Sequence, residues 1–231
     1  MGSHFQALLM AGEVRQTTGF LLKFNNDYTD TVGHTVVLGP GASIPTYVTV
    51  GGDSAIDFGG SAYPTNGGPN GVQILPIADL NPLALDFTLE GTWTITARSD
   101  RFRILSKIIG TGFFYSLEAD ADGFGNMFFT AQFSTGPVSI SSLGSSANLL
   151  TYGSTYHLRL SRIGNNFEFW VNGVSRGTTS NSYKSSAGTA TVDFGNSMPP
   201  SIDALVGSIS WARYLLGQGL NNGLIPAEPS K

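Results

Sequence analysis

The sequence predicts an all-β protein made of two antiparallel sheets that pack face to face. The first observation is the segment 156–179, where apolar and polar residues alternate along successive short runs. A period of two is the pattern of a strand with one face on a core. The second is Asn172-Gly173 between two of these runs, a pair that adopts the positive φ angles of a type I′ hairpin turn. The third is composition, because 30 glycines and only 12% charged residues favour short strands and many turns over long surface helices.

The same alternation and the turn residues predict further strands along the chain. They are expected at 20–24, 54–63, 86–98, 103–109, 112–119, 127–133, 190–194 and 206–215, with a second early strand ending at Leu38 and a weak one at 138–141. About a dozen short strands without a helical period indicate a sandwich or a barrel. We expect the first and last strands to pair, because a sandwich must cover its sheet edges.

Length and charge limit the domain organisation and the classes of partner. A chain of 231 residues fits one β-sandwich domain. We place this domain at 5–216, after a remnant of cloning at 1–4 and before a flexible tail or linker at 217–231. The net charge of −4 offers no basic surface for nucleic acid or an anionic membrane. The lack of cysteine excludes disulfides, and no apolar run approaches the ~20 residues of a membrane span.

Five segments, taken in order, resemble one family of β-sandwich domains. They are GFLLKFNNDYTDTVG (19–33), SAIDFGG (54–60), DFTLEGTW (86–93), YHLRLSRIGNNFEFWVNG (156–173) and VGSISWARYL (206–215). Together they cover most of 19–216 and resemble the concanavalin A-like, laminin-G-type domain. The resemblance implies a two-sheet antiparallel jelly-roll sandwich. It also implies one of the family's associations, which are carbohydrate binding, protein–protein adhesion and, in one branch, glucan hydrolysis.

The variant of this family with a similar opening segment is common in bacteriophage virion proteins, as a fibre, decoration or tail appendage domain. By that resemblance the protein is expected in a virion or on an extracellular surface. Its partners would be a glycan or other virion proteins, and a homo-oligomer is left open. This association is an analogy, since fold does not determine function.

Calcium is a frequent structural ion in this family, and an Asp in the closing strand is one of its ligands. This chain has Ser210 at the matching position, while Asp27 and Asp30 in the opening loop are the candidate metal ligands. Calcium takes six to eight oxygens, several of them charged, so the missing carboxylate weakens such a site. The alternative is a solvated turn in which the Asp side chains bond their own backbone. No other cofactor is expected.

One fragment, Glu118-Ala-Asp120-Ala-Asp122, resembles the carboxylate motif of jelly-roll glucanases. A retaining glycosidase needs two carboxyl groups ~5–5.5 Å apart. Here the third acidic residue comes one position early and Asp122-Gly123 is itself a turn signal, so a structural hairpin over 117–128 is the alternative. Outside the cloning remnant only His34 and His157 remain, and they lack metal-ligand spacing. We therefore expect a protein without catalytic residues.

Sugar binding needs an aromatic platform and a few convergent polar groups. Trp170 lies on the polar face of its strand, with His157 and Arg159 across the hairpin. We expect His157 at the surface. The candidate ligand residues are Trp170, Trp211, Tyr63, Tyr183, His157, Arg159 and Asn172, the two tyrosines being in loops at the rim. In the structural alternative, Trp170 packs under a neighbouring loop.

Three hypotheses follow for the function. The favoured one is a non-catalytic module that attaches a virion or another large particle to a surface glycan. The second is a structural module that makes protein–protein contacts in a capsid decoration, fibre or tail. The third is a jelly-roll glycoside hydrolase, which requires Glu118 and Asp120 side by side in an open cleft.

Overall fold

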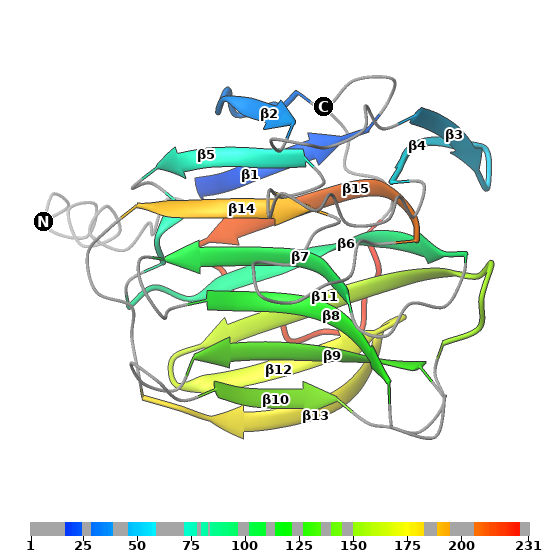
Figure 1. Cartoon of the computed structure of the whole chain (residues 1–231). Coiled ribbons are helices and arrows are strands. Elements are labelled where there is room, and N and C mark those ends of the chain that lie inside the picture. The colour runs from blue at the N-terminus through cyan, green and yellow to red at the C-terminus, as the bar shows by residue number, and fades with distance from the viewer. Residues whose placement is uncertain are drawn as a thin grey trace, which may run out of the picture.

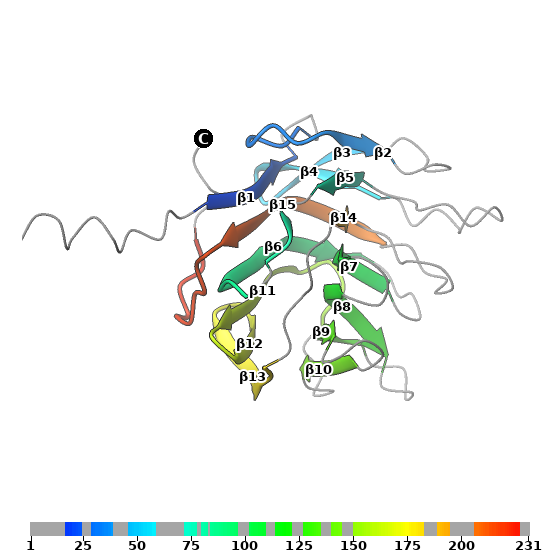
Figure 2. The same ribbon diagram turned by 90° about the vertical axis from the view of Figure 1, so that its left-hand side faces the viewer.

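The computed structural model consists of two antiparallel sheets that pack against each other (Figure 1, Figure 2). It describes residues 17–24, 29–38, 46–58, 72–77, 80–82, 84–96, 102–109, 114–121, 127–134, 140–144, 150–182, 189–194 and 206–226. Within these ranges there is no α-helix, and hence none of the length and apolarity that a membrane span requires.

The first sheet, here called sheet A, has eight strands. Neighbouring strands follow the order β13-β12-β11-β6-β15-β4-β3, and β1 also pairs with β15. The bounds are β1 Thr17–Lys23, β3 Thr46–Val50, β4 Asp53–Asp57, β6 Phe87–Ile95, β11 Thr155–Ile163, β12 Asn166–Val171, β13 Val174–Ser180 and β15 Gly207–Leu216.

The second sheet, here called sheet B, has seven strands in the order β10-β9-β8-β7-β14-β5-β2. The bounds are β2 Val36–Leu38, β5 Val72–Ile77, β7 Phe102–Ile109, β8 Phe114–Ala121, β9 Met127–Ser134, β10 Ile140–Gly144 and β14 Ala190–Phe194. The pairings in both sheets are antiparallel, and strands distant in sequence become neighbours, such as β14 between β7 and β5. This is the connectivity of a jelly-roll sandwich.

The long closing strand β15 organises sheet A. One of its edges pairs with β6, and the other is shared by β4 and β1. The predicted pairing of the first and last strands is therefore confirmed. The register with β6 shifts at Ser210, which is the extra residue of a β-bulge. The bulge leaves Ile209 in the core and turns Trp211 to the outer face of the sheet.

Two tight hairpins join β11, β12 and β13. The first loop consists of Gly164 and Asn165, and Gly164 has a φ of 60°, which suits the first central position of a type II′ turn. The second loop consists of Asn172 and Gly173, with φ angles of 49° and 74°. Both angles are positive, so the predicted type I′ turn is confirmed.

The core lies between the two sheets and is rich in aromatic rings. Phe133 of β9 and Phe167 of β12 stack across it with their ring centroids 4.2 Å apart and an interplanar angle of 2°. Leu158 and Phe169, on which the predicted alternation depends, are both fully buried. Burial of a side chain of this size contributes about 1.5–3 kcal/mol, so these positions hold the sheets together.

The predicted all-β, concanavalin A-like sandwich is confirmed, and most predicted strands are present. Two described strands, β3 and β5, were not among the predicted ones. The sequence of β5, VQILPI, contains Gln73 near its start and then a short apolar run interrupted by Pro76. A run of this kind lacks the period of two, and proline lowers the strand propensity, so the pattern alone does not identify it.

Candidate functional site

The outward-facing side chains of sheet A line up in rows, because paired residues on neighbouring strands point to the same face. One row crosses five strands and consists of Arg213, Glu90, Arg159, Trp170 and Ser175. The next row consists of Leu215, Thr88, Ser161, Glu168 and Thr178. A third row lies on the opposite side of the first one and contains His157, Thr92 and Trp211, since Thr92 pairs with both of the others. Polar side chains from β15, β6, β11, β12 and β13 thus share one face.

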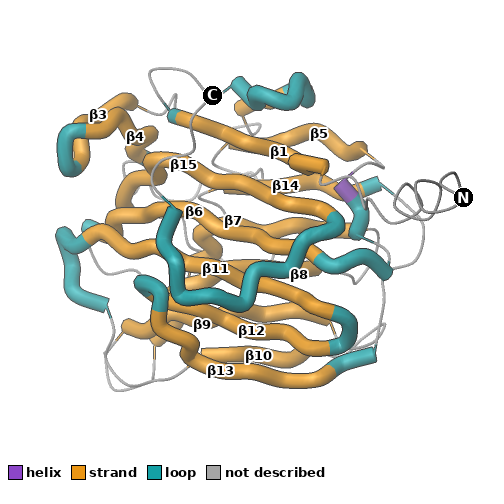
Figure 3. The backbone as a smooth tube through the Cα atoms, turned by 180° about the vertical axis from the view of Figure 1, so that it is seen from behind, coloured by secondary structure: helices purple, strands orange, loops and turns teal. Residues whose placement is uncertain are grey.

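Residues 217–226, here called the C-terminal strap, run across this outer face (Figure 3). The hydroxyl of Ser161 donates to the carbonyl of Leu220 at 2.6 Å. The hydroxyl of Thr88 donates to the carbonyl of Gln218 and accepts from the N–H of Leu220, both at 2.9 Å. Up to residue 226 the predicted flexible tail is therefore bound to β6 and β11 rather than free. Its backbone groups find partners on the sheet, which a polar, glycine-rich sequence does not reveal.

Beneath the strap lies a buried charge cluster centred on Glu90. Its carboxylate accepts the Nε–H of Arg159 at 2.8 Å and the Nε–H of Arg213 at 2.6 Å. The Nε2 of His157 lies 3.0 Å from the same carboxylate. Glu90 is fully buried, and His157 and Arg159 are nearly so. Four ionisable side chains from three strands therefore share one site, in which Arg213, at 19%, is the most exposed.

The surroundings of Glu90 set its charge state. Burial alone would raise the pKa of this carboxyl, but the hydrogen bond from His157 and the positive charges of Arg159 and Arg213 lower it from 4.5 to about 2. Glu90 is therefore ionised at neutral pH. A general acid or base needs a pKa near the working pH, so this cluster has the properties of a structural ion network rather than of a catalytic pair.

Arg159 connects the charge cluster to the strap. Its two terminal amino groups donate to the carbonyl oxygens of Asn222 and Leu224, each at 2.7 Å. Gly223, between these carbonyls, lies close to Gly173, because a Cβ on Gly223 would come within 2.6 Å of the Gly173 carbonyl oxygen. Polar contacts and a close backbone approach thus fix the same part of the strap.

The two tryptophans of this face lie at different depths. Trp211 is buried, with the His157 ring 5.7 Å from its own and the guanidinium of Arg213 5.9 Å from its ring centroid. Trp170 is half-buried and lies beside Gly223 of the strap. The structural alternative for Trp170, packing under a neighbouring segment, agrees with this position.

The structure brings the predicted ligand residues of β11, β12 and β15 to one face but covers most of them. The expected surface position of His157 is wrong, because the side chain is 4% exposed and faces Glu90. Asn172 occupies the type I′ turn, and its Oδ1 accepts the N–H of His157 at 2.8 Å. Tyr63 and Tyr183 lie outside the described residues. Their predicted contacts with a ligand stay predictions.

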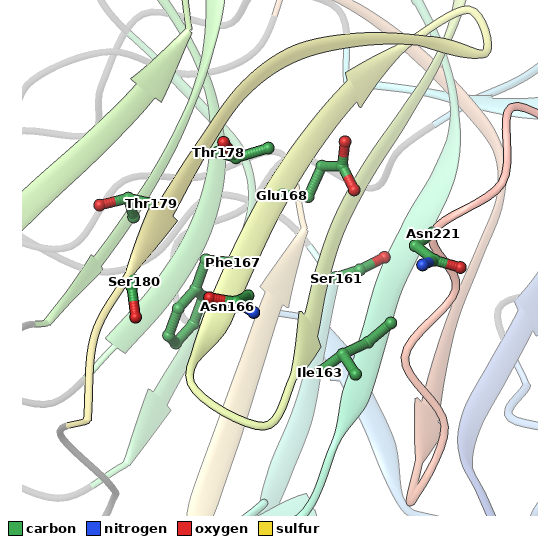
Figure 4. Close-up of a pocket in the computed structure, with 9 residues that line it drawn as sticks. All are labelled: Ser161, Ile163, Asn166, Phe167, Glu168, Thr178, Thr179, Ser180 and Asn221. Carbon is green, nitrogen blue, oxygen red and sulfur yellow. The ribbon is translucent and has the colours of Figure 1, made fainter.

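An open cleft lies beside the strap, on the outer face of β11, β12 and β13 (Figure 4). Its volume is about 600 Å³, which is within the range of small-ligand sites. The lining residues are Ser161, Ile163, Asn166, Phe167, Glu168, Thr178, Thr179, Ser180 and Asn221. Asn221 belongs to the strap, so the strap forms one wall of the cleft.

Several hydrogen-bonding groups of the cleft have no partner among the described residues. These are the side chains of Asn166, Thr178 and Asn221. Glu168 accepts the hydroxyl of Ser175 at Oε1, at 2.6 Å, which leaves Oε2 without a described partner. Amides and hydroxyls both donate and accept, and a carboxylate accepts. The cleft can therefore hold a molecule that carries several hydroxyl groups.

Asp30, one of the two predicted metal ligands, is buried and bonded within the chain. Its Oδ1 accepts the N–H groups of Leu21 and Val32 at 2.9 and 3.1 Å, and its Oδ2 accepts the N–H and contacts the ring Nδ1 of His34. These bonds to nearby backbone agree with the turn proposed as the alternative to calcium binding, but the side chain is buried rather than solvated as that alternative expected. Asp27 lies outside the described residues, and the described part of the chain holds no cluster of three His, Cys, Asp or Glu side chains suited to a metal ion.

The carboxylate motif of β8 does not meet the requirement of a hydrolase. Glu118 is fully buried and accepts the hydroxyl of Ser116 at 2.6 Å, so it does not face an open cleft. The side chain of Asp120 lies outside what the structure describes. The cleft on β11, β12 and β13 has a single carboxylate among its lining residues, Glu168, whereas glycoside hydrolysis uses a pair.

Three important residues of this face were not singled out from the sequence. Glu90 had no signal of its own, because alternation only places it on the outward face, and its burial there comes from the strap and from partners on β11 and β15. Thr178 faces outward beside Glu168, but only the register of β12 and β13 places it at the cleft. Asn221 had no signal, since nothing in the local sequence shows that the strap lies on the sheet.

No protein-family model matches this chain, and no curated protein matches it. Solved structures do share its fold. One is domain 4 of AbnA, a GH43 extracellular arabinanase from Geobacillus stearothermophilus, in complex with arabinotriose. It has a TM-score of 0.63 and 14% identity, over 89% of this chain and 95% of that chain.

Binding domains of botulinum neurotoxins share the fold as well. The serotype D domain has a TM-score of 0.62 and 12% identity, and the DC domain, solved with rat synaptotagmin II, has 0.60 and 14%. Each match covers 89% of this chain and 49% of the other, so this chain spans about half the length of those structures. At these identities the likeness shows a lectin-like β-sandwich fold, and function has to be argued from the site.

Proposed function

We propose that this chain is a non-catalytic module that binds a glycan in the cleft on β11, β12 and β13. The observation that carries the proposal is the convergence of Asn166, Glu168, Thr178 and Asn221 on one open cleft, with hydrogen-bonding capacity that no described residue uses. Sugars suit such a site, because each hydroxyl both donates and accepts. Ile163, which is 36% exposed, adds an apolar surface for the CH groups of a sugar ring.

The known structures support the proposal at the level of the fold. Domain 4 of AbnA was solved with arabinotriose, and another match comes from a study of the entry of botulinum neurotoxin type C through two ganglioside molecules. Sandwiches of this kind can therefore carry glycan sites. The position and chemistry of the site in this chain are argued from its own cleft.

Trp170 stays in the proposal as an aromatic flank of the site. It shares the outward face of β12 with Glu168, and part of its side chain is open to solvent. Trp211, His157 and Arg159 are covered, so we assign them to the support of the strap rather than to direct contact with a ligand.

The particle that carries this module is proposed from the resemblance of the opening segment, which favours a virion or an extracellular surface. A structural module in a capsid decoration, fibre or tail is the second candidate. It is favoured by exposed apolar side chains at the end of the strap, namely Leu224 and Ile225, which are 73% and 50% exposed. Ile225 lies beside the turn between β12 and β13, because its Cγ1 would be 3.5 Å from a Cβ on Gly173.

A glycan array with the purified chain tests the proposed function. The wild type should bind a subset of glycans, and Thr178→Val or Asn221→Ala should weaken that binding about tenfold, since each removes groups that pair with the ligand. Thr92→Val is the matched control, because Thr92 of β6 lies on the same outer face of sheet A but outside the cleft. Trp170→Ala tests the aromatic flank in the same assay.

Two results would separate the candidates. Loss of glycan binding in the cleft variants, with retention in Thr92→Val, supports the glycan module. An absence of binding to every glycan, together with a stable oligomer in light scattering that Leu224→Asp dissociates, supports the structural module instead.

A further inference from the structure

The charge of the cleft limits the class of glycan that it can take, and this inference rests on the proposed glycan binding. Glu168 is the single ionisable side chain among the nine lining residues. Its carboxylate is held in place, because Ser175 of β13 donates its hydroxyl to Oε1. In the register Glu168 lies between Ser161 and Thr178, and Figure 4 shows its side chain between them. A fixed negative charge thus lies within the cleft.

No cation among the described residues neutralises this charge. Glu168 forms no ion pair with them. Arg159, on the same face, is already bound to Glu90 and to two strap carbonyls. Arg176 of β13 lies where the register with β12 shifts and is not one of the lining residues. As far as the described residues go, the carboxylate of Glu168 therefore carries an uncompensated charge and is available to a ligand.

We propose that the cleft selects neutral, hydroxyl-rich glycans and rejects glycans whose acidic sugar would enter it. A sugar hydroxyl can donate to the free Oε2 of Glu168, while the amides of Asn166 and Asn221 and the hydroxyl of Thr178 serve neighbouring hydroxyls. A sugar carboxylate in the same place would lose hydration and meet a like charge without a cation to pair with. Even with the screening of bulk water, such a contact weakens binding about fivefold.

The test uses pairs of oligosaccharides that differ only in acid groups, such as galactotriose and trigalacturonic acid, in which each of the three sugars carries a carboxylate in place of the primary alcohol. Both members of a pair are printed on the array used for the proposed function. The wild type should bind the neutral member of a pair at least about fivefold more tightly at low salt. Glu168→Gln removes the charge but keeps the shape of the side chain, so it should reduce the ratio of the neutral to the acidic affinity. Added salt should narrow the wild-type ratio without any substitution, because it screens exposed charges.

Asp57→Asn is the matched control, because it removes the same charge from β4, three strands away from β11 in sheet A. It should leave the ratio unchanged. The proposed specificity would be wrong if acidic members bound as tightly as neutral ones, or if neither Glu168→Gln nor salt altered the ratio of the two affinities. The proposed glycan binding would still hold in both cases. An array on which neither member of any pair binds would overturn the proposed function, and the specificity with it.

Discussion

Arg159 places its Nε 2.8 Å from the Glu90 carboxylate and its two terminal amino groups 2.7 Å from backbone carbonyls of the strap. One side chain thus joins a buried charge cluster to the segment that covers it. The strap in turn supplies Asn221 to the cleft. The charge cluster, the strap and the cleft therefore form one connected unit, and changes in the first should be measurable in the other two.

Replacing Glu90 with glutamine should strongly destabilise the fold. The change keeps the shape of the side chain but leaves Arg159 and Arg213 without their counter-charge in a buried site. Removal of one partner from a buried ion pair costs about 3–5 kcal/mol. The free energy of unfolding in urea at pH 7 measures this loss. Glu168→Gln is the control, since that carboxylate is partly exposed and forms no ion pair with a described residue, and it should change stability by no more than about 0.5 kcal/mol.

The contribution of Glu90 to stability should depend on pH in a defined direction. Its pKa in the folded chain is about 2, below the ordinary value of 4.5. Because the folded pKa is the lower one, the stabilisation is fully present above pH 4.5 and is lost as the pH falls from 4.5 towards 2. The gap in unfolding free energy between the wild type and Glu90→Gln should therefore be smaller at pH 3 than at pH 7. A gap of equal size at both values would contradict the pairing of Glu90 with its cations.

Replacing Arg159 with lysine should loosen the strap. An ammonium group cannot reach the carboxylate and two carbonyls together as a planar guanidinium does. Each hydrogen bond from a charged donor contributes about 1.5–3 kcal/mol, so the loss of one should weaken the local structure measurably. Hydrogen exchange at the amide of Leu220, which donates to Thr88, should become faster.

Arg213→Lys is the matched control for this experiment. Arg213 also binds Glu90, but it makes no contact with the strap among the interactions of the described residues. Exchange at Leu220 should therefore stay close to that of the wild type. Equal acceleration in both variants would mean that the charge cluster, rather than the two strap carbonyls, determines the stability of the strap.

The sequence predicts which residues face outward but not what covers them. Alternation in 156–173 correctly places Leu158 and Phe169 inside and His157 and Arg159 on the opposite face. An outward position suggested solvent for His157, yet the side chain is buried. Burial on that face depends on Glu90, far away in sequence, and on the strap, whose glycine-rich sequence is also typical of a linker.

The position of Trp211 shows a second limit of prediction from the sequence. Plain alternation from Ile209 would put both side chains in the core, and the bulge at Ser210 turns Trp211 outward. A bulge is a property of the pairing of two strands and has no reliable signal in one of them. The cleft could not be predicted for a similar reason. It combines β12 and β13 with Asn221, and only the folded chain brings Asn221 to these strands.

Replacing Gly91 with alanine should destabilise the centre of sheet A. A Cβ at this position would lie 2.5 Å from the carbonyl oxygen of Trp211 and 2.7 Å from the ring of Trp93. Both neighbours are buried, so they have little room to move, and overpacking of this kind costs about 1–3 kcal/mol. Thermal unfolding measures the effect. Thr92→Ala, next in the strand and facing outward, is the comparison, and a Gly91→Ala variant as stable as this control would refute the tight packing.

Replacing Gly223 with alanine should shift the strap away from Trp170. The new Cβ would lie 2.6 Å from the carbonyl oxygen of Gly173, and a backbone carbonyl in a tight turn cannot easily move. We expect a loss of about 1 kcal/mol in stability and stronger quenching of tryptophan fluorescence by iodide. The change in quenching reports on Trp170, because Trp93 and Trp211 are buried.

Leu224→Ala is the control for this last prediction. Leu224 is the next residue of the strap and 73% exposed, and the substitution keeps the carbonyl that accepts from Arg159. It should leave both stability and quenching unchanged. Because Asn221 is part of the same strap, Gly223→Ala should also weaken the binding of glycans in the cleft, whereas Leu224→Ala should not. Wild-type quenching in Gly223→Ala would show that the strap does not depend on the close approach to Gly173.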